Sequence, residues 1–271
     1  MAEDKGRVVL LTGAAGGLGA VMAAALLRDG HAIAALDRNA DSLKTLCAAH
    51  KSERLFPIEA DVENIAACGA AVEKTVAHFG RIDALINNAG IGMSSIRPDA
   101  ESRHPQIEEL TAETWDRFFA INVRAAMLLA QAAVPHMRKA RWGRIVNNTT
   151  SYRTMHRVLP YGATKAAFES MSAVWALELA DTGITVNVLV PGGPTDTPFI
   201  SDAAGWPRDK MLRPQVMAAP IRWLISDASN GVTGRRFTGG EWDPALPPEQ
   251  AARAASRDIG WPELTAKPSW W

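Results

Sequence analysis

The sequence has few of the residues that bind metals or form disulfides. Its 271 residues include two cysteines, Cys47 and Cys68, whose spacing does not suit a metal site and whose surroundings are apolar and helical in pattern. We therefore expect two reduced thiols and no metal. Lys and Arg number 29, as do Asp and Glu, so no net charge favours nucleic acid or an anionic membrane as a partner.

Long apolar runs are missing as well. No stretch of eighteen apolar residues indicates a membrane span, and a strand pattern begins by Arg7, which leaves no room for a signal peptide. There is no internal repeat and no low-complexity tract. The 47% hydrophobic content is ample for the core of one large α/β domain or two small ones. We expect a cytoplasmic protein.

A glycine-rich turn near the amino terminus suggests a dinucleotide site. The apolar run of residues 8–11 has the pattern of a strand buried on both faces, and it leads through Thr-Gly-Ala-Ala-Gly-Gly-Leu-Gly (residues 12–19) into an Ala- and Leu-rich helix. In this context the glycines let the backbone approach a pyrophosphate, which then lies at the positive end of the helix. The turn alone is weak evidence.

An acidic residue follows at the end of the next strand. Asp37 lies 24 positions beyond Gly13, close to where a carboxylate accepts hydrogen bonds from the adenosine ribose. A carboxylate there repels a 2′-phosphate, and Gly16 offers no cation, so NAD is favoured over NADP. Arg38 leaves NADP open, because its guanidinium could contact a 2′-phosphate, although it could equally stack on adenine.

Two more strands complete the first half of the chain. Residues 55–60 lead to Asp61, which is expected near the adenine, as the N-cap of the following helix, or in both roles. Residues 82–86 lead to Asn-Asn-Ala-Gly (residues 87–90), whose small side chains would let backbone pack close to a cofactor. Strands that alternate with helices in this way predict a parallel, doubly wound α/β sheet.

The pair Tyr161 and Lys165 carries the chemistry. The two residues lie four positions apart, so a helix over them places both on one face. A phenol has a pKa of about 10 and is therefore a poor proton shuttle at neutral pH. A nearby ammonium favours the phenolate and is expected to lower that pKa towards the range of efficient general acid–base catalysis. The spacing is common by chance and persuades only in combination with the motifs before it.

Together the glycine turn, the Asn-Asn-Ala-Gly segment and the Tyr-x-x-x-Lys pair resemble the short-chain dehydrogenase/reductase family. The motifs occur in the order and spacing of the family, over about residues 7 to 240. The resemblance implies a single Rossmann-type domain with helices on both faces, NAD(P)-dependent chemistry on alcohols and carbonyls, and a homodimer or homotetramer.

The resemblance also assigns roles to single residues. Asn122 is similar to a helix asparagine that helps hold a proton-relay water near the lysine. Where the family usually has a serine, this chain has Thr150, with Ser151 next, and the loop from either to Tyr161 is shorter than usual. Either hydroxyl could polarise a carbonyl oxygen, so both remain candidates. With these residues, the catalytic candidates are Asn122, Thr150, Ser151, Tyr161 and Lys165.

The cofactor contacts follow from the same motifs. Pro191-Gly192 resembles the loop over the nicotinamide, and Thr195 and Thr197 straddle the expected hydroxyl position. The cofactor-binding candidates are Gly13, Ala15, Gly16, Gly17, Leu18, Gly19, Asp37, Arg38, Asp61, Val62, Asn88, Ala89, Gly90, Tyr161, Lys165, Pro191, Gly192, Thr195 and Thr197.

The function expected is that of an NAD-dependent oxidoreductase that interconverts a secondary alcohol and a ketone. Residues 91–110, with Arg97, Arg103 and His104, read as a solvated lid, and the aromatic and apolar residues around positions 152–159 and 199–211 favour a hydrophobic or ring-bearing substrate. The alternatives are a catalytically silent NAD(P)-binding sensor or scaffold and a sugar-nucleotide epimerase or dehydratase.

The chain divides into two parts in this interpretation. Residues 1–240 form the dinucleotide-binding and catalytic domain, and residues 241–271 form an extension that carries four of the nine tryptophans. Aromatic residues at that density suit an interface better than free solvent. We expect the extension to pack against a neighbouring subunit.

Overall fold

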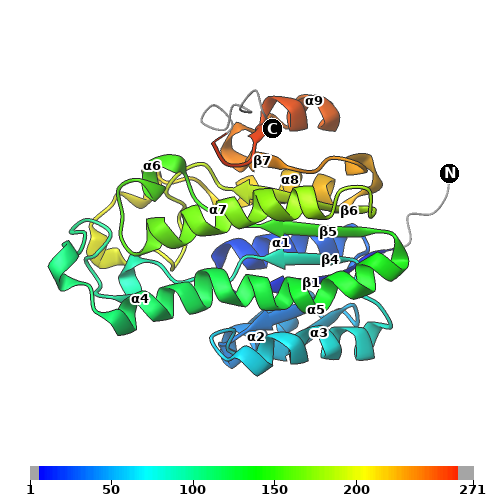
Figure 1. The fold of residues 1–271 in the computed structure, drawn as a ribbon, viewed down its shortest axis with the longest axis horizontal. Helices are drawn as coiled ribbons and strands as arrows, with labels where there is room; N and C mark the ends of the chain where they lie inside the picture. Colours follow the sequence, from blue (N-terminus) through cyan, green and yellow to red (C-terminus); the bar gives the residue numbers. More distant parts are fainter. Residues whose placement is uncertain (1–5, 262–271) are drawn as a thin grey trace, which may run out of the picture.

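The computed structural model describes residues 6–261 and is built on one eight-stranded sheet (Figure 1). The strand order is β3-β2-β1-β4-β5-β6-β7-β8, and each pairing is parallel except that of β8 with β7. The strands are β1 (Val8–Thr12), β2 (Ala32–Asp37), β3 (Leu55–Glu59), β4 (Ala84–Asn87), β5 (Gly143–Asn147), β6 (Ile184–Val190), β7 (Arg235–Thr238) and β8 (Ser256–Asp258). This confirms the predicted doubly wound parallel sheet of the Rossmann type.

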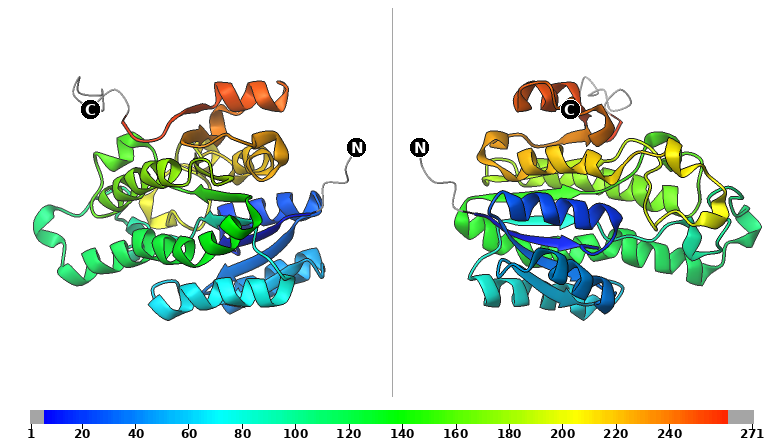
Figure 2. Two further views of the ribbon diagram at one scale, coloured as in Figure 1. Left: turned by 45° about the vertical axis from the view of Figure 1, so that its right-hand side comes forward. Right: turned by 180° about the vertical axis from the view of Figure 1, so that it is seen from behind.

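Helices cover both faces of the sheet (Figure 2). One face is packed by α1 (Gly17–Arg28), α2 (Ala40–His50) and α8 (Ala218–Ile225). The other is packed by α3 (Ile65–Phe79), α5 (Ala125–Ala140) and α7 (Tyr161–Glu178). The remaining helices are α4 (Ala112–Phe119), α6 (Tyr152–Met155) and α9 (Pro248–Ala254).

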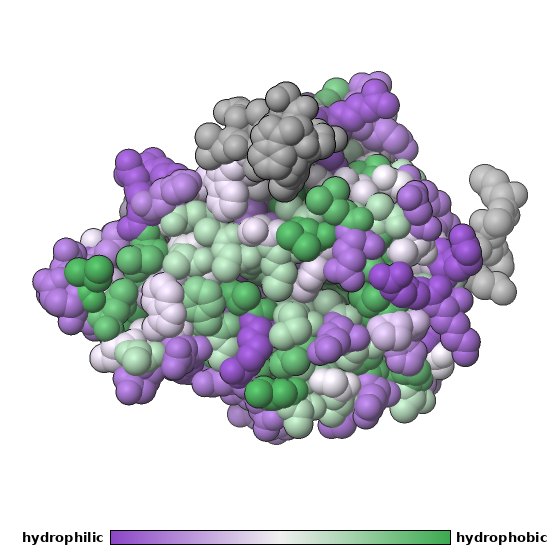
Figure 3. Space-filling view, viewed as in Figure 1, coloured by the Kyte–Doolittle hydropathy of each residue, from purple (hydrophilic) through white to green (hydrophobic). Residues whose placement is uncertain are grey.

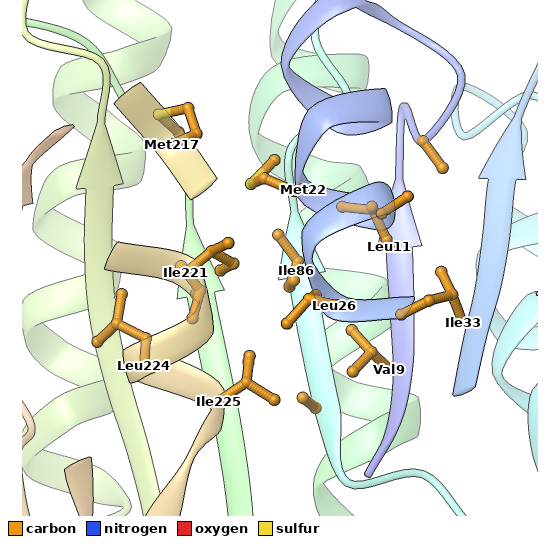
Figure 4. Packing of buried hydrophobic residues seen from close by; sticks show 14 of the residues in the cluster. Val9, Leu11, Met22, Leu26, Ile33, Ile86, Met217, Ile221, Leu224 and Ile225 are labelled. Atoms are coloured by element: carbon orange, nitrogen blue, oxygen red, sulfur yellow. The ribbon is translucent and has the colours of Figure 1, made fainter. Parts of the chain in front are cut away.

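The continuous apolar runs of the sequence become strands that are buried on both faces. In β1, Val9 and Leu11 point to one helical layer and Leu10 points to the other, as the two-residue period of a strand requires. Figure 4 shows the first layer, where Met22 and Leu26 of α1 meet the sheet beside the apolar residues of α8. The two layers hold the carboxyl ends of the parallel strands at a common edge.

That edge is where a ligand is expected. The chain leaves β1 towards β2 on one side and returns through β4 on the other, so the strand order reverses between β1 and β4. Loops that diverge at such a switch point leave a crevice beyond the carboxyl ends of the strands. The glycine turn after β1 and the Asn-Asn-Ala-Gly segment after β4 both lie there.

Asparagines start two of the helices. The side chain of Asn39 accepts hydrogen bonds from the backbone of Asp41 and Ser42 at 3.1 and 3.0 Å and so caps α2. Asn64 caps α3 by accepting from Ala66 at 2.9 Å. The proposed N-cap role of Asp61 is therefore wrong, because Asp61 instead accepts from the backbone of Glu63 at 2.9 Å in the turn ahead of the helix.

Helix α4 continues into α5 through a π-helical turn, Ala120–Arg124. The resulting 29-residue run, Ala112–Ala140, contains an 18-residue window of mean hydropathy 1.4, which is long and apolar enough to cross a bilayer. Half of that window is buried inside the fold, as expected of a core helix that packs on the sheet.

The chain beyond residue 240 continues the sheet, which the sequence pattern did not predict. After α9, the strand β8 pairs antiparallel with β7, and the ring of Trp242 lies 6.1 Å from that of Trp223 in α8. Residues 241–261 thus pack on their own chain. Trp270 and Trp271 lie outside the described residues, and the predicted contact with a neighbouring subunit stays a prediction.

Candidate functional site

The glycine turn has the shape of an anion cradle. Gly13 has φ +61°, a left-handed conformation that favours glycine, and a Cβ atom on Gly19 would lie 2.0 Å from the carbonyl oxygen of Gly13. Helix α1 begins at Gly17 after Gly16, which makes no side-chain cap, so its first backbone N–H groups point out of the helix end. Close backbone packing and a helix start without a side-chain cap fit the pyrophosphate of a dinucleotide.

Asp37 stands beside this turn at the end of β2. Its carboxylate accepts from the backbone of Ala15 at 3.1 Å and of Asn39 at 3.0 Å. The structure therefore brings Asp37 and the glycine turn together, as the spacing predicted. Arg38 is exposed next to it, and Asp61 is exposed at the end of β3. Val62 is buried in the core.

Asn88 joins the ends of three strands. Its amide nitrogen donates to the carbonyl oxygens of Thr12 and Gly13 at 3.0 and 3.1 Å, and its amide oxygen accepts from Asn148 at 3.0 Å. The backbone of Ala89 donates to the hydroxyl of Thr12 at 3.0 Å. This arrangement fixes the glycine turn after β1 relative to the segments after β4 and β5.

Lys165 lies at the far end of the same arrangement. It is 4% exposed, and its Nζ donates to the carbonyl oxygen of Asn148 at 2.8 Å. A Cβ atom on Gly90 would lie 3.6 Å from that Nζ and 3.0 Å from the Oδ1 of Asn122, so only a residue without a side chain fits comfortably. Burial lowers the pKa of Lys165 to about 8.

Asn122 lies in the π-helical turn and is 1% exposed. Its side chain accepts from the backbone of Ile91 at 2.8 Å and donates to the Ile91 carbonyl at 3.1 Å and to the hydroxyl of Thr164 at 3.1 Å. Single π turns are often found at functional sites. This one holds the loop after β4 against the helix that carries Tyr161 and Lys165.

Tyr161 starts helix α7, and its environment differs from the expectation. Burial raises the pKa of Tyr161 to about 12, the hydrogen bond with Thr150 opposes that rise, and the Glu101 carboxylate adds to it. The Lys165 nitrogen lies 5.7 Å from the centre of the Tyr161 ring. The expected lowering of the phenol pKa by Lys165 is therefore not found, because desolvation of the phenolate is the largest cause of the shift and only hydrogen bonding to Thr150 opposes it.

The two candidate hydroxyls have different roles in the structure. Hydrogen bonding to the side chain of Thr150 lowers the pKa of the Tyr161 phenol. The Ser151 hydroxyl instead caps α6, where it accepts from the backbone of Thr154 at 3.1 Å and lies 2.9 Å from the Thr154 hydroxyl. Of the two hydroxyls, that of Thr150 is therefore the one that acts on the Tyr161 phenol.

The segment after β6 closes over the glycine turn. Gly192 has φ +105°, and the carbonyl of Pro191 accepts from the backbone of Gly240 at 2.8 Å. Thr195 and Thr197 are both buried, and a Cβ atom on Gly17 would lie 2.4 Å from the side chain of Thr197. Thr197 therefore lies against the cradle.

Glu101 is a residue near the site that the sequence analysis missed. It is 7% exposed, its Oε1 accepts from the backbone of Ser94 at 3.3 Å, and burial raises its pKa. It lies in the loop of residues 91–110, where Arg97 pairs with Asp99 at 3.1 Å and with Glu109 at 3.4 Å. Arg97 thus forms ion pairs within its own loop. Glu101 was missed because a glutamate in a polar loop gives no sequence signal that its side chain is buried.

The comparison with known families decides the class. The family model of short chain dehydrogenases matches residues 7–206. The chain belongs to the short-chain dehydrogenase/reductase family. In this short-chain dehydrogenase, the matched residues include the glycine turn and the pair Tyr161 and Lys165.

Relatives of this short-chain dehydrogenase have several substrates. It is 33% identical over 247 residues to D-threitol dehydrogenase of Mycolicibacterium smegmatis, an alignment that covers 84% of this chain and 89% of the relative. It is 31% identical over 244 residues to a 3-oxoacyl-[acyl-carrier-protein] reductase of Thermotoga maritima, with 85% and 95% covered.

A solved structure agrees with the fold. The 3-ketoacyl-(acyl-carrier-protein) reductase of Brucella melitensis, crystallised with NADH, superposes with a TM-score of 0.73 at 28% identity. The superposition covers 87% of this chain and 98% of the reductase. A nicotinamide cofactor and a small-molecule substrate are therefore expected of this oxidoreductase.

Proposed function

We propose that the protein is an NAD-dependent oxidoreductase that interconverts a secondary alcohol and a ketone. The observation that carries the proposal is the pairing of Tyr161 with the Thr150 hydroxyl, one helical turn from the buried Lys165. A bound nicotinamide would supply or accept the hydride, and the protein supplies the proton and the orientation.

The proton step belongs to Tyr161. In the direction of reduction, the neutral phenol donates its proton to the carbonyl oxygen of the substrate, while Thr150 donates a hydrogen bond to the same oxygen. A pKa of about 12 keeps the phenol protonated at neutral pH, which suits this direction. In oxidation, the phenolate takes the hydroxyl proton.

Lys165 and Asn122 support this step. The Lys165 ammonium donates to the Asn148 carbonyl, and in this proposal it binds the nicotinamide ribose and attracts the developing phenolate. Asn122 binds residue 91 and Thr164 with its side chain and is proposed to help hold the water of a proton relay. Burial lowers the pKa of Lys165 to about 8, so near neutral pH its ammonium can exchange a proton with such a relay.

NAD is the proposed cofactor because of Asp37. Its carboxylate lies next to the glycine turn, where it would accept from the ribose hydroxyls and repel a 2′-phosphate. The exposed Arg38 is the residue that would favour NADP. Asp61 and Val62, at the end of β3, remain proposed contacts for the adenine.

The substrate is proposed to be hydrophobic or ring-bearing. Met93, Ala100 and Val158 form a small buried cluster against which Tyr161 packs, and the ring of Phe199 lies 5.9 Å from the Tyr161 ring. Of these side chains, that of Phe199 is 40% exposed and offers aromatic surface beside Tyr161. An alcohol with a cyclic or aryl group would bury that surface on binding.

Two other functions are weaker. A silent NAD-binding sensor would have no need to keep both Tyr161 and Lys165 in contact range of one cleft. A sugar-nucleotide epimerase or dehydratase would be expected to have a separate substrate domain, whereas residues 6–261 are built on one sheet.

A homodimer or homotetramer is proposed from the exposed apolar side chains of the helical face around α7. Trp115, Met127, Val174 and Leu177 are 38%, 39%, 57% and 80% exposed. Figure 3 shows hydrophobic residues across the face where α5 and α7 lie. Exposed apolar surface of this kind is often buried between subunits.

A cytoplasmic location is proposed because Cys47 and Cys68 are free thiols and form no disulfide with each other.

The experiment is to follow nicotinamide absorbance with cyclohexanol, 1-phenylethanol and threitol, and with the matching ketones, each with NAD(H) and NADP(H). We expect NAD-linked turnover of the cyclic and aryl alcohols well above that of threitol. Turnover of threitol well above that of the other two would contradict the proposed substrate class. Absence of turnover in both directions with tight NADH binding would favour the silent sensor.

A further inference from the structure

A buried ion pair lies behind the proposed active site. Arg236 of β7 and Glu169 of α7 are 5% and 0% exposed, and the Arg236 Nη1 lies 2.6 Å from the Glu169 Oε2. Removing two charges from water is costly, so a buried pair is weak evidence for stability. The question is what the pair holds in place.

The pair holds the segment that carries Thr150. The Arg236 Nη1 also donates to the hydroxyl of Thr149 at 3.0 Å, and that hydroxyl donates to the Glu169 carboxylate at 2.6 Å. The second nitrogen of the guanidinium, Nη2, donates to the carbonyl oxygen of Thr150. The two terminal nitrogens of the planar Arg236 guanidinium, here called the fork, thus fix both the residue before Thr150 and the Thr150 backbone itself.

The carboxyl-terminal strand belongs to the same network. The Tyr152 hydroxyl donates to the carbonyl of Gly260 at 2.7 Å and lies 3.3 Å from the Glu169 Oε1, to which the backbone of Gly260 donates at 3.4 Å. The Arg236 guanidinium stacks 4.3 Å from the centre of the Tyr152 ring. Residues 149, 150 and 152 are therefore held from one side by Arg236, Glu169 and the segment after β8.

We propose that Arg236 is a positioning residue that orients the Thr150 hydroxyl towards Tyr161, and that Gly260 extends this support to the carboxyl-terminal segment. The inference rests on the proposed function, in which Thr150 hydrogen-bonds the reacting oxygen. Because Arg236 fixes the Thr150 backbone through its carbonyl, loss of the fork lets the hydroxyl rotate away from the line of proton transfer. Small displacements of a catalytic group lower the rate of the chemical step more than they lower binding.

The test compares Arg236→Lys with Arg235→Lys. A lysine at 236 can keep its charge beside Glu169 but cannot reach Glu169, Thr149 and the Thr150 carbonyl together. Arg235 is the matched control, since it is the neighbouring strand residue and pairs with Asp258 of β8 on the surface. Within the described part of the chain its side chain makes no hydrogen bond or ion pair with residues 149–152. Both variants loosen β7, but only one releases the fork.

The readouts are steady-state kinetics with the alcohol turned over fastest in the panel, NADH binding by fluorescence, and hydrogen exchange of residues 147–155. For Arg236→Lys we expect kcat to fall about 10- to 100-fold, with KM and the NADH Kd within about threefold of the wild type, and faster exchange in that segment. For Arg235→Lys we expect all three readouts to stay within about threefold. Equal effects of the two variants, or a loss confined to KM or to NADH binding, would overturn the proposal.

A second variant covers the case in which Arg236→Lys does not fold. Thr149→Val is nearly isosteric and removes the hydroxyl between Arg236 and Glu169 without removing a charge. It should show the same selective loss of kcat and the same faster exchange. If Tyr161→Phe keeps wild-type turnover, the proposed function fails. If Tyr161→Phe is inactive while Thr149→Val and Arg236→Lys behave as Arg235→Lys does, only the positioning role fails.

Discussion

The Nζ atom of Lys165 lies 2.8 Å from the carbonyl oxygen of Asn148 and 5.7 Å from the centre of the Tyr161 ring. The lysine is thus held to the end of β5 by the backbone, and Asn148 is in turn bonded through Asn88 to the glycine turn. Lys165, which lies one helical turn from the proposed proton donor, and the proposed cofactor cradle are therefore parts of one hydrogen-bonded frame. A substitution that disturbs the cradle should therefore also displace Lys165.

Substitutions of Thr150 and of Ser151 should have different effects on turnover. Thr150→Ala removes the hydroxyl that bonds Tyr161, and we expect kcat to fall by about 100-fold, the size typical of a lost transition-state hydrogen bond. Ser151→Ala removes only the N-cap of α6, which costs about 1 kcal/mol of stability and should leave kcat within about threefold of the wild type. Kinetics and thermal unfolding of both variants measure this. The opposite ranking would assign the catalytic hydroxyl to Ser151.

The pH dependence should differ between the two directions. The raised pKa of Tyr161, about 12, keeps the phenol protonated, and the Lys165 ammonium, whose pKa is about 8, stays charged in acid, so ketone reduction should change little between about pH 5 and 7. Alcohol oxidation needs the phenolate, whose population grows as the pH rises towards that pKa, so its rate should rise over the same range.

The Glu101 carboxylate contributes to the raised pKa of Tyr161. In Glu101→Gln this contribution is lost, the phenol pKa falls, and the oxidation profile should shift to lower pH. Glu108→Gln is the control, because Glu108 is an exposed residue of the same loop. Stopped-flow or steady-state pH profiles check the result, and an unshifted profile in Glu101→Gln would show that Glu101 does not act on Tyr161.

Cofactor choice should depend on Asp37. Asp37→Ala removes the acceptor for the ribose and the repulsion of a 2′-phosphate, so we expect the ratio of kcat/KM with NAD to that with NADP to fall at least about tenfold, equivalent to about 1.4 kcal/mol. Asp41→Ala is the matched control, since Asp41 is exposed in α2 and pairs with Lys44. An unchanged ratio in Asp37→Ala would place the ribose elsewhere.

Two glycines offer opposite outcomes for one substitution. A Cβ atom on Gly19 would lie 2.0 Å from the Gly13 carbonyl oxygen, so Gly19→Ala should lower stability by about 2 kcal/mol or more and weaken NADH binding. Gly69, inside α3, has nothing within 4 Å of a built Cβ, so Gly69→Ala should add about 0.5 to 1 kcal/mol without affecting binding. Denaturant unfolding and NADH titration measure both, and tolerance of alanine at residue 19 would contradict the cradle.

Local sequence patterns predicted the elements and motifs that depend on near neighbours. The apolar runs became strands because both faces of a parallel sheet are buried, and Tyr161 and Lys165 share a helix because four residues make about one turn. The glycine turn follows from a backbone conformation and close packing that side chains would prevent.

Features that depend on distant neighbours were not predictable in the same way. The Arg236 and Glu169 pair joins residues 67 positions apart and reads in the sequence as two surface charges. The phenol pKa was expected to fall beside Lys165, but it depends on how completely the folded chain removes water from Tyr161. The eighth strand is three residues long, too short to give a pattern of its own.

The most direct test of the account is Tyr161→Phe. The substitution removes the phenolic hydroxyl and keeps the ring that packs beside Phe199. With NADH and the best ketone of the panel, we predict that turnover falls by at least about 1,000-fold, within the range that a positioned proton donor contributes, while the Kd for NADH stays within about threefold. Turnover near that of the wild type would contradict the central claim that Tyr161 transfers the proton.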